Sequence, residues 1–204
     1  MPKITDISYQ NQNKKRCNLF LDGEFLCGLS LESVIKFRLK VGQEIEKDAL
    51  TELIKDNERI EALSKAADYV SKSLKTKRQV KDYLLRKGYS EELAWEIVDK
   101  LKEYDYINDK EYSKRYIESV SKTQGKRLVE YKLMSKGVKK DDIEHAYTET
   151  DINSKENAKI VVEKYLRNKE KTKENIAKAY RYLIGRGFSY DEASFALSKV
   201  DDDD

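Results

Sequence analysis

The chain contains the stretch Tyr83-Leu84-Leu85-Arg86-Lys87-Gly88-Tyr89-Ser90 and two degraded copies of it. The copies are Lys132-Leu133-Met134-Ser135-Lys136-Gly137-Val138-Lys139 and Tyr182-Leu183-Ile184-Gly185-Arg186-Gly187-Phe188-Ser189. Their glycines fall at 88, 137 and 187, in steps of 49 and 50 residues. A fixed period of this size indicates supersecondary units that stack on one another.

The residues around each glycine indicate the end of one helix and the start of the next. A cation directly before the glycine suits the negative C-terminal end of a helix. Glycine supplies the left-handed cap conformation. Acids follow it, and Ser90 and Ser189 can serve as N-caps. Apolar residues at offsets 6, 9 and 10 then share one helical face. Each unit is predicted to be helix, glycine turn, helix, with a further helix in front.

Composition favours helix over sheet. Charged residues make up 39% of the 204 residues, with 1 Pro and 8 Gly. The net charge of +3 does not by itself predict a polyanionic partner. Since there is no apolar run of 18 residues, we expect no membrane association. The start, Met1-Pro2-Lys3-Ile4, does not resemble a signal peptide, so a cytoplasmic location is expected.

The N-terminal residues 4 to 29 are predicted to form strands. Asp22-Gly23 is a two-residue hairpin signal that would pair Phe20 with Phe25 and Leu19 with Leu26. In such a tight hairpin Cys17 and Cys27 would lie on opposite faces. We therefore expect reduced thiols and no disulfide.

Helices are predicted to follow the hairpin, and residues 4 to 9 are predicted to add a third strand. Ser30 would cap a helix that reaches about Leu39. A second helix is expected over Lys47 to Lys65, with Asp48 as its cap. This helix either continues into the first repeat or stacks on it.

The expected fold is mainly α: three tandem three-helix repeats, elongated and curved, with a small N-terminal β-hairpin element. Asn108 and Glu111 predict a capping box at the start of the second repeat. In the third repeat we expect an inward face that includes Ile160, Val161 and Leu166. The expected divisions are 1–59 (N-terminal element), 60–109, 110–152 and 153–200 (the repeats) and 201–204 (an acidic tail).

The residues also resemble the RecX family, regulators of the bacterial recombinase RecA. The most specific marker is Tyr106-Ile107-Asn108-Asp109 after Lys100-Leu101, and the second is Gly125-Lys126 leading to Leu133-x-x-Lys136-Gly137. The resemblance covers essentially the whole chain and is best in the first repeat. It implies a monomer of three helical repeats that binds RecA on single- or double-stranded DNA and mostly inhibits it; some members also bind DNA directly.

Charge is segregated within each repeat, independently of that resemblance. The first two helices of each unit are basic, and the third is acidic. The basic segments are 71–87 (+6), 114–140 (+7) and 155–187 (+6); the acidic segments 91–111, 141–151 and 191–204 each carry −5. Stacked units repeat their faces, so a basic stripe and an acidic stripe are expected. The basic stripe would contact phosphates, and the acidic stripe would meet a basic protein groove.

The candidate RecA- and DNA-binding residues are the cations of this basic stripe. They are Lys77, Arg78, Lys87, Arg115, Lys126, Arg127, Lys132, Lys136, Lys164, Arg167 and Arg186. For any single lysine, simple solvation of a surface is the more common explanation. The threefold repetition of the pattern carries more weight than any one residue.

The sequence shows no constellation that could run a reaction. His145 has no obvious partner, and no phosphate-binding loop occurs. Trp95 is expected at the rim of a core. We therefore expect a non-enzymatic regulator, without metal or cofactor, that lies in the groove of the RecA filament. A direct DNA-binding protein, built from units that resemble helix-turn-helix folds, is the alternative. An inert scaffold would bind neither.

Overall fold

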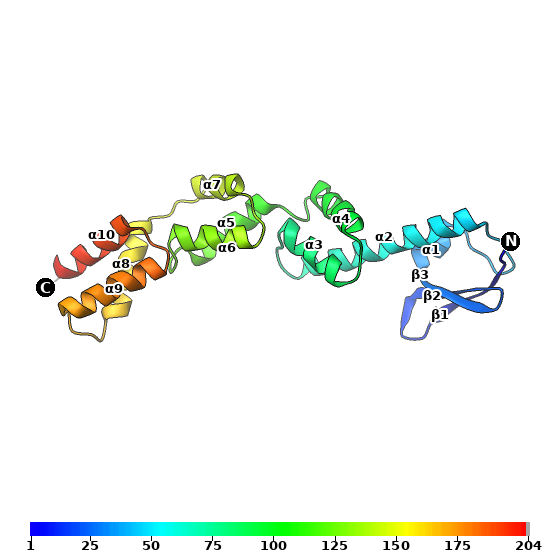
Figure 1. The fold of residues 1–204 in the computed structure, drawn as a ribbon, viewed down its shortest axis with the longest axis horizontal. Coiled ribbons are helices and arrows are strands. Elements are labelled where there is room, and N and C mark those ends of the chain that lie inside the picture. The colour runs from blue at the N-terminus through cyan, green and yellow to red at the C-terminus, as the bar shows by residue number, and fades with distance from the viewer. Residues whose placement is uncertain (203–204) are drawn as a thin grey trace. The chain divides into compact units, whose positions relative to one another are not determined.

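The computed structural model describes residues 1–202 and has three strands followed by ten helices in that range (Figure 1). The chain divides into two compact units. Unit 1 consists of Met1–Ser73 and Lys81–Tyr106, and unit 2 consists of Leu74–Val80 and Ile107–Asp204. A mainly α fold with a small N-terminal sheet is therefore confirmed.

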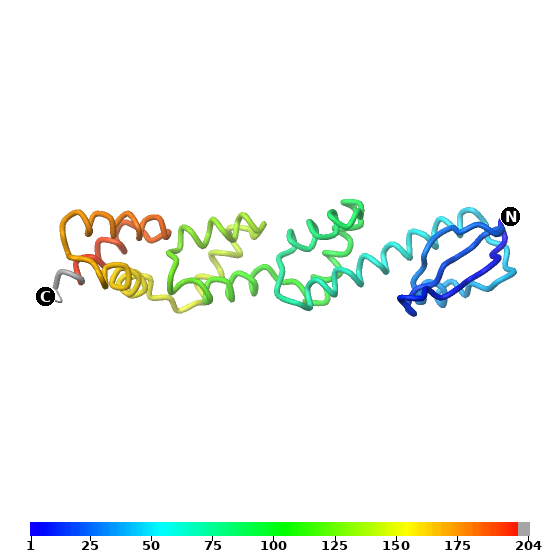
Figure 2. Tube along the Cα trace, turned by 90° about the horizontal axis from the view of Figure 1, so that it is seen from below, coloured from blue at the N-terminus to red at the C-terminus, as the bar shows by residue number. Residues whose placement is uncertain are grey.

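The N-terminal sheet is antiparallel, with strands β1 (Ile4–Gln10), β2 (Asn13–Leu21) and β3 (Glu24–Ser30) in that order. The strands lie side by side in Figure 2. Between β2 and β3, Asp22 and Gly23 have φ of 50° and 88°, as a tight hairpin turn requires.

One pairing in this hairpin was predicted wrongly. Phe20 lies opposite Phe25, as expected, with ring centroids 5.7 Å apart. Leu19, however, lies opposite Cys27 and not Leu26, because the register shifts between Leu19 and Phe20. An extra residue of this kind moves every later side chain to the other face of the strand.

The register shift also corrects the expected placement of the cysteines. Cys17 lies opposite Leu29, two residues from Cys27 along β3, so both cysteines are on the same face of the sheet. Both are free thiols. Such diagonal neighbours are about 7–8 Å apart, beyond the usual reach of a disulfide. Burial raises the pKa of both thiols.

Helix α1 (Leu31–Lys36) starts as predicted but ends earlier. The Ser30 Oγ accepts a hydrogen bond from the Ser33 backbone N–H at 3.0 Å. The helix stops at Lys36 because Arg38 takes a left-handed conformation, with φ 49°. That reversal folds Leu39 back into the N-terminal core, where it is 8% exposed.

Helix α2 (Lys47–Ser71) is one continuous helix of 25 residues. Glu46, and not Asp48, is its N-cap residue. Its first half buries Leu53 in the core under the sheet, and its second half buries Ala62 and Ala66. The helix therefore continues from the N-terminal element into the first repeat, and position 59/60 lies inside it. The domain boundaries drawn from the sequence stay predictions.

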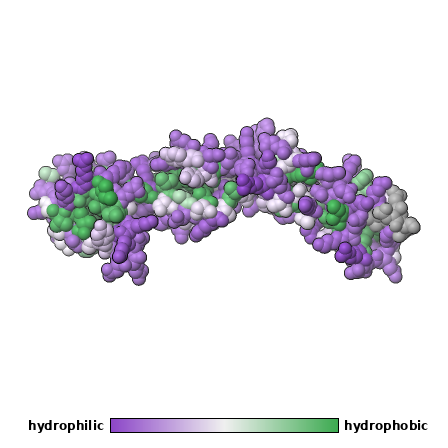
Figure 3. All heavy atoms as spheres, turned by 180° about the vertical axis from the view of Figure 1, so that it is seen from behind, coloured by the Kyte–Doolittle hydropathy of each residue, from purple (hydrophilic) through white to green (hydrophobic). Residues whose placement is uncertain are grey.

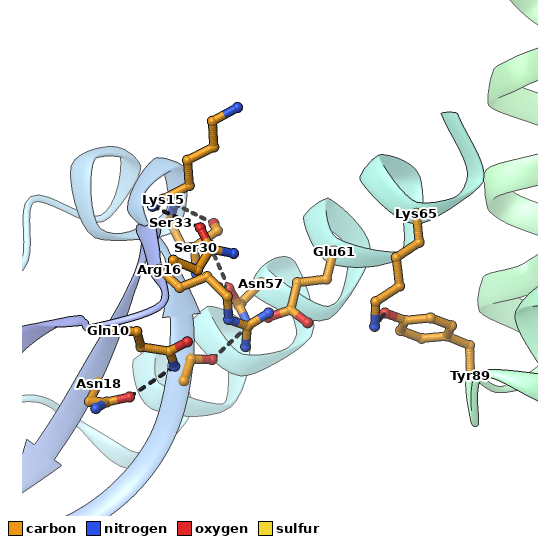
Figure 4. Close-up of polar contacts among 12 residues, drawn as sticks. Gln10, Lys15, Arg16, Asn18, Ser30, Ser33, Asn57, Glu61, Lys65 and Tyr89 are labelled. Carbon is orange, nitrogen blue, oxygen red and sulfur yellow. Dashed lines mark hydrogen bonds and ion pairs between the residues drawn. The ribbon is translucent and has the colours of Figure 1, made fainter. Parts of the chain in front are cut away.

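Asn57 fastens the sheet and α1 to α2 (Figure 4). Its side-chain oxygen accepts from the Ser30 backbone N–H at 2.7 Å and from the Ser33 hydroxyl at 3.1 Å. Its amide nitrogen donates to the Gly28 carbonyl at 3.3 Å and to Glu61 at 3.1 Å. All four hydrogen-bonding positions of this buried amide are thus used, which avoids the cost of an unsatisfied polar group.

Three three-helix repeats follow. The second half of α2 forms the first with α3 (Lys77–Arg86) and α4 (Glu91–Glu103). The second contains α5 (Asp109–Val120), α6 (Lys126–Ser135) and α7 (Lys140–Thr148). The third contains α8 (Ser154–Leu166), α9 (Lys173–Gly185) and α10 (Tyr190–Asp202). Residues 203–204 of the predicted acidic tail lie outside the described residues, and α10 includes the backbone of 201–202.

Within unit 2 each repeat has its own core. One core is centred on Ile117 and Leu133, the other on Leu183 and Phe188. In α8 the inward face was partly predicted wrongly, since Ile160 is 52% exposed while Val162 is fully buried. Position 160 is two residues from both Ala158 and Val162, and therefore lies on nearly the opposite side of the helix from the apolar face that they form.

The three glycine turns have the same backbone geometry, as the sequence predicts. φ is 89° at Gly88, 84° at Gly137 and 88° at Gly187. In each turn the glycine N–H donates to the carbonyl three residues earlier, and the next N–H donates to the carbonyl five residues earlier. This pair of bonds is the Schellman motif. The residues that follow, Tyr89, Val138 and Phe188, are all buried.

Capping after the turns differs among the repeats. The Ser90 hydroxyl accepts from the Leu93 N–H, and the Ser189 hydroxyl accepts from the Glu192 N–H, as predicted. Lys139, at the same place in the second repeat, makes no side-chain capping bond. At the start of α5, the Asn108 side chain accepts from the N–H groups of Lys110 and Glu111, which confirms Asn108 as the predicted cap.

Candidate nucleic-acid interface

The first of two cationic clusters forms where the start of α3 contacts the Gly137 turn, inside unit 2. The buried Thr76 hydroxyl donates to the Lys136 carbonyl at 2.7 Å. Arg78 lies against the glycine: a Cβ built on Gly137 would be 2.4 Å from the Arg78 Cβ and Cδ. Helix α3 therefore begins directly on the turn that ends α6, and this contact brings Arg78 beside Lys136.

Asp109 fixes the third cation of this cluster. The Lys77 backbone N–H donates to the Asp109 carboxylate at 3.0 Å, and the Lys77 ammonium lies 3.9 Å from its other oxygen. Asp109 is 5% exposed, while the Lys77 side chain is 31% exposed. The acid thus holds the helix start in place and leaves part of the lysine charge at the surface.

The second cluster forms in the same way where α6 contacts the Gly187 turn. The Gly125 N–H donates to the Arg186 carbonyl at 2.9 Å, and the Arg127 N–H donates to the Gly187 carbonyl at 3.2 Å. The two backbones touch, since a Cβ on Gly125 would lie 2.3 Å from Gly187 main-chain atoms. These main-chain contacts place Lys126 and Arg127 next to Arg186.

We call these two sets the junction clusters: Lys77, Arg78 and Lys136 in the first, and Lys126, Arg127 and Arg186 in the second. Each combines two cations at the start of a helix with the cation that precedes a glycine. The N-terminal end of a helix adds partial positive charge. Each cluster therefore suits an anion such as a phosphate.

Aromatic rings position two cations of the second cluster. The Lys126 ammonium lies 4.9 Å from the centre of the Tyr147 ring and 3.6 Å from Glu130. The Arg186 guanidinium lies 5.0 Å from the centre of the Tyr182 ring. Burial, helped by the charge of Glu130, raises the pKa of Tyr147 well above its usual range, so its phenol stays neutral beside Lys126.

Lys132 approaches the second cluster from α6, because its ammonium donates to the Gln124 side chain at 2.8 Å. Four other predicted residues make no hydrogen bond or ion pair with the residues of either junction cluster within residues 1–202. They are Lys87, Arg115, Lys164 and Arg167. Of these, Arg115 pairs with Glu111 at 2.6 Å, and Lys87 lies 5.7 Å from the Tyr83 ring centre.

Sequence reasoning did not assign Thr76 and Gly125, which build the junctions, to the site, and Gly125 entered only as part of a family marker. A signal for them was present. Each stands twelve residues before the glycine of its own repeat and directly before a Lys-Arg pair. The third repeat has Thr172 at the corresponding helix start, fifteen residues before Gly187.

Within residues 1–202, no group of three or more His, Cys, Asp or Glu side chains could hold a metal ion. No helix in that range is long and apolar enough to cross a membrane. Trp95 is 41% exposed and lies 4.8 Å from the Lys81 ammonium, at the edge of the first repeat. The visible surface in Figure 3 is mostly hydrophilic.

Comparison with known proteins gives matches along the chain. Residues 2–46 match the model of the regulatory protein RecX N-terminal domain, residues 62–101 match the RecX first three-helix domain, and residues 154–197 match the third. The regulatory protein RecX of Clostridium botulinum (strain Alaska E43 / Type E3) is 36% identical over 94% of this chain and 92% of its own. The chain belongs to the RecX family.

Other RecX proteins support this assignment and the fold. Regulatory protein RecX of Bacillus subtilis (strain 168) is 31% identical over 98% of this chain and 78% of its own. A crystal structure of regulatory protein RecX is 25% identical, with a TM-score of 0.74 over 97% of this chain and all of the other. RecX from Lactobacillus salivarius gives a TM-score of 0.63 at 27% identity, over 70% of this chain and 96% of its own. The resemblance seen in the sequence is confirmed, and the family is one of regulatory proteins.

Proposed function

We propose that this chain is a non-enzymatic regulator that binds the RecA nucleoprotein filament, lies in its groove and mostly inhibits recombination and ATP hydrolysis by RecA. It acts as a cytoplasmic monomer without a cofactor. The observation that carries the proposal is the pair of junction clusters. The same three-cation arrangement occurs at two successive contacts between repeats.

The junction clusters are suited to the DNA inside the filament. Each holds three cations on a frame built largely from main-chain or buried hydrogen bonds, so little backbone freedom is lost when a phosphate binds. Neutralised phosphates release counterions, and the affinity should therefore fall steeply with salt. The exposed acids Glu92 and Asp141, at the starts of α4 and α7, are available for a basic protein groove.

The proposal is tested with RecA ATPase on single-stranded DNA while the protein is titrated in. The test variant reverses Lys126, Arg127, Lys132 and Lys136 to Glu, and should inhibit at least about tenfold less strongly. A charge-matched control reverses Lys14, Lys47, Lys110 and Lys122, all exposed and outside both clusters. The control should inhibit like the parent chain, and circular dichroism should show that both variants fold.

Two results would count against the proposal. If the variant with reversed cluster charges inhibits RecA as strongly as the parent chain, the clusters are not part of the interface. A parent chain without effect on RecA, but with salt-sensitive binding to naked DNA, would support the alternative of a direct DNA-binding protein. The junction clusters favour that alternative as the second candidate, because they would bind naked DNA by the same phosphate contacts.

A further inference from the structure

Unit 1 contains a groove of about 1020 Å³ that belongs to neither junction cluster. Its walls come from β2, α1, α2 and α4, which all lie in unit 1. Figure 4 shows part of it: Arg16 reaches from β2 to Glu61 on α2, and Lys65 reaches from α2 to Tyr89. The groove therefore has a fixed wall on the side of the sheet.

Most acids of the groove are already neutralised. Three ion pairs line it: Arg16 with Glu61 at 2.8 Å, Lys36 with Asp56 at 2.5 Å, and Arg59 with Glu96 at 3.0 Å. Three further cations, Lys15, Lys65 and Lys100, form no ion pair within residues 1–202, and Glu32 is the one lining acid left over there. The unpaired charge of the groove is thus positive.

The groove also has an apolar strip. Ile35 is 67% exposed and lines the groove together with the half-buried Ile60 and Leu63. An isoleucine side chain left in water forgoes the favourable free energy of its burial. An occupant with an aliphatic side chain would cover it.

We propose that this groove binds an extended acidic segment of a protein. An aliphatic side chain of the segment packs on Ile35, and carboxylates face Lys15 and Lys100. Nucleic acid fits less well, because its backbone carries no aliphatic side chain to cover Ile35. The inference uses unit 1 alone and does not rest on the filament proposal.

The test measures fluorescence anisotropy of a labelled twelve-residue peptide, Asp-Gly-Leu repeated four times, against the full chain at low salt. Its counterpart, with Lys in place of Asp, should not bind. Lys15→Glu with Lys100→Glu should weaken binding about tenfold, and Ile35→Asp should weaken it by a similar factor. The matched control, Lys47→Glu with Lys72→Glu, changes exposed lysines of unit 1 outside the groove and should stay within about twofold of the parent.

The proposal is overturned if the acidic peptide does not bind, if both peptides bind equally, or if the groove and control variants behave alike. Single-stranded DNA is measured in parallel. Loss of DNA binding in the groove variant but not in the control would assign the groove to nucleic acid, and would also overturn the proposal. Thermal unfolding of each variant distinguishes lost binding from lost folding.

Discussion

Gly88 in unit 1 and Gly187 in unit 2 end their helices with the same pair of hydrogen bonds and nearly the same φ, 89° and 88°. Their surroundings differ completely. A Cβ on Gly88 would meet nothing within 4 Å, whereas a Cβ on Gly187 would lie 2.4 Å from the Leu128 main-chain nitrogen. The repeated sequence thus dictates the turn in both places, but only at Gly187 does the turn also carry a junction with a neighbouring repeat.

The largest effect should come from Gly187→Ala. The left-handed φ disfavours alanine, and the new methyl group would collide with the main chain of α6, which must move as a whole. We expect a loss of about 3 kcal/mol in the free energy of unfolding, measured with urea.

Gly185→Ala, two residues earlier, is the control for Gly187→Ala. Gly185 is the last residue of α9 and has nothing within 4 Å of an added Cβ, so alanine should be neutral or stabilise by up to about 0.5 kcal/mol. If both substitutions lowered the free energy of unfolding equally, the contact of Gly187 with α6 would not contribute to stability.

Gly137→Ala should cost somewhat less, about 2 kcal/mol. The methyl would lie 2.4 Å from side-chain carbons of Arg78, which can shift more easily than a backbone. The same urea experiment checks the rank. A loss larger than that of Gly187→Ala would show that the start of α3 is held more rigidly than the start of α6.

Gly88→Ala should be the mildest of the three turn substitutions, with a loss of about 1 kcal/mol. Only the strain of a left-handed alanine is expected there, because the space beside Gly88 is open. A loss near that of Gly187→Ala would indicate that something covers the Gly88 turn.

The smallest effects concern the helix caps after the turns. Ser189→Ala removes the acceptor for the Glu192 N–H and should cost about 1 kcal/mol. Lys139→Ser supplies a cap where the second repeat has none, and should stabilise by about 0.5 kcal/mol. Thermal midpoints of the two variants should move in opposite directions, and a shift in the same direction would contradict the capping account.

The local parts of this fold could be predicted from sequence, and the reason is physical. A left-handed φ at Gly88 and caps at Ser90 and Asn108 depend on a few neighbouring residues. The register shift at Leu19 depends instead on how β2 and β3 pack against the core, and no turn residue in the sequence predicts it. The early end of α1 before the left-handed Arg38 also depends on tertiary packing, because Leu39 is buried in the same core.

The candidate site was predictable residue by residue but not as a site. Charge segregation singled out Arg78, Lys126 and Arg186 individually. Their grouping depends on the contact of one repeat with the turn of the next, and Thr76 and Gly125 make that contact through a hydroxyl and a main-chain N–H. The periodicity of the sequence predicts the helices and turns of each repeat. It does not predict which atoms of two neighbouring repeats come into contact.

Helix α2 is shared by two cores, and this has a consequence for how unit 1 opens. Leu53 anchors its first half under the sheet, while Ala62 and Ala66 anchor its second half among the helices of the first repeat. Fraying of one half removes support from the other, so the sheet and the first repeat should exchange their slowest amide hydrogens at a common rate, as a single cooperative unit.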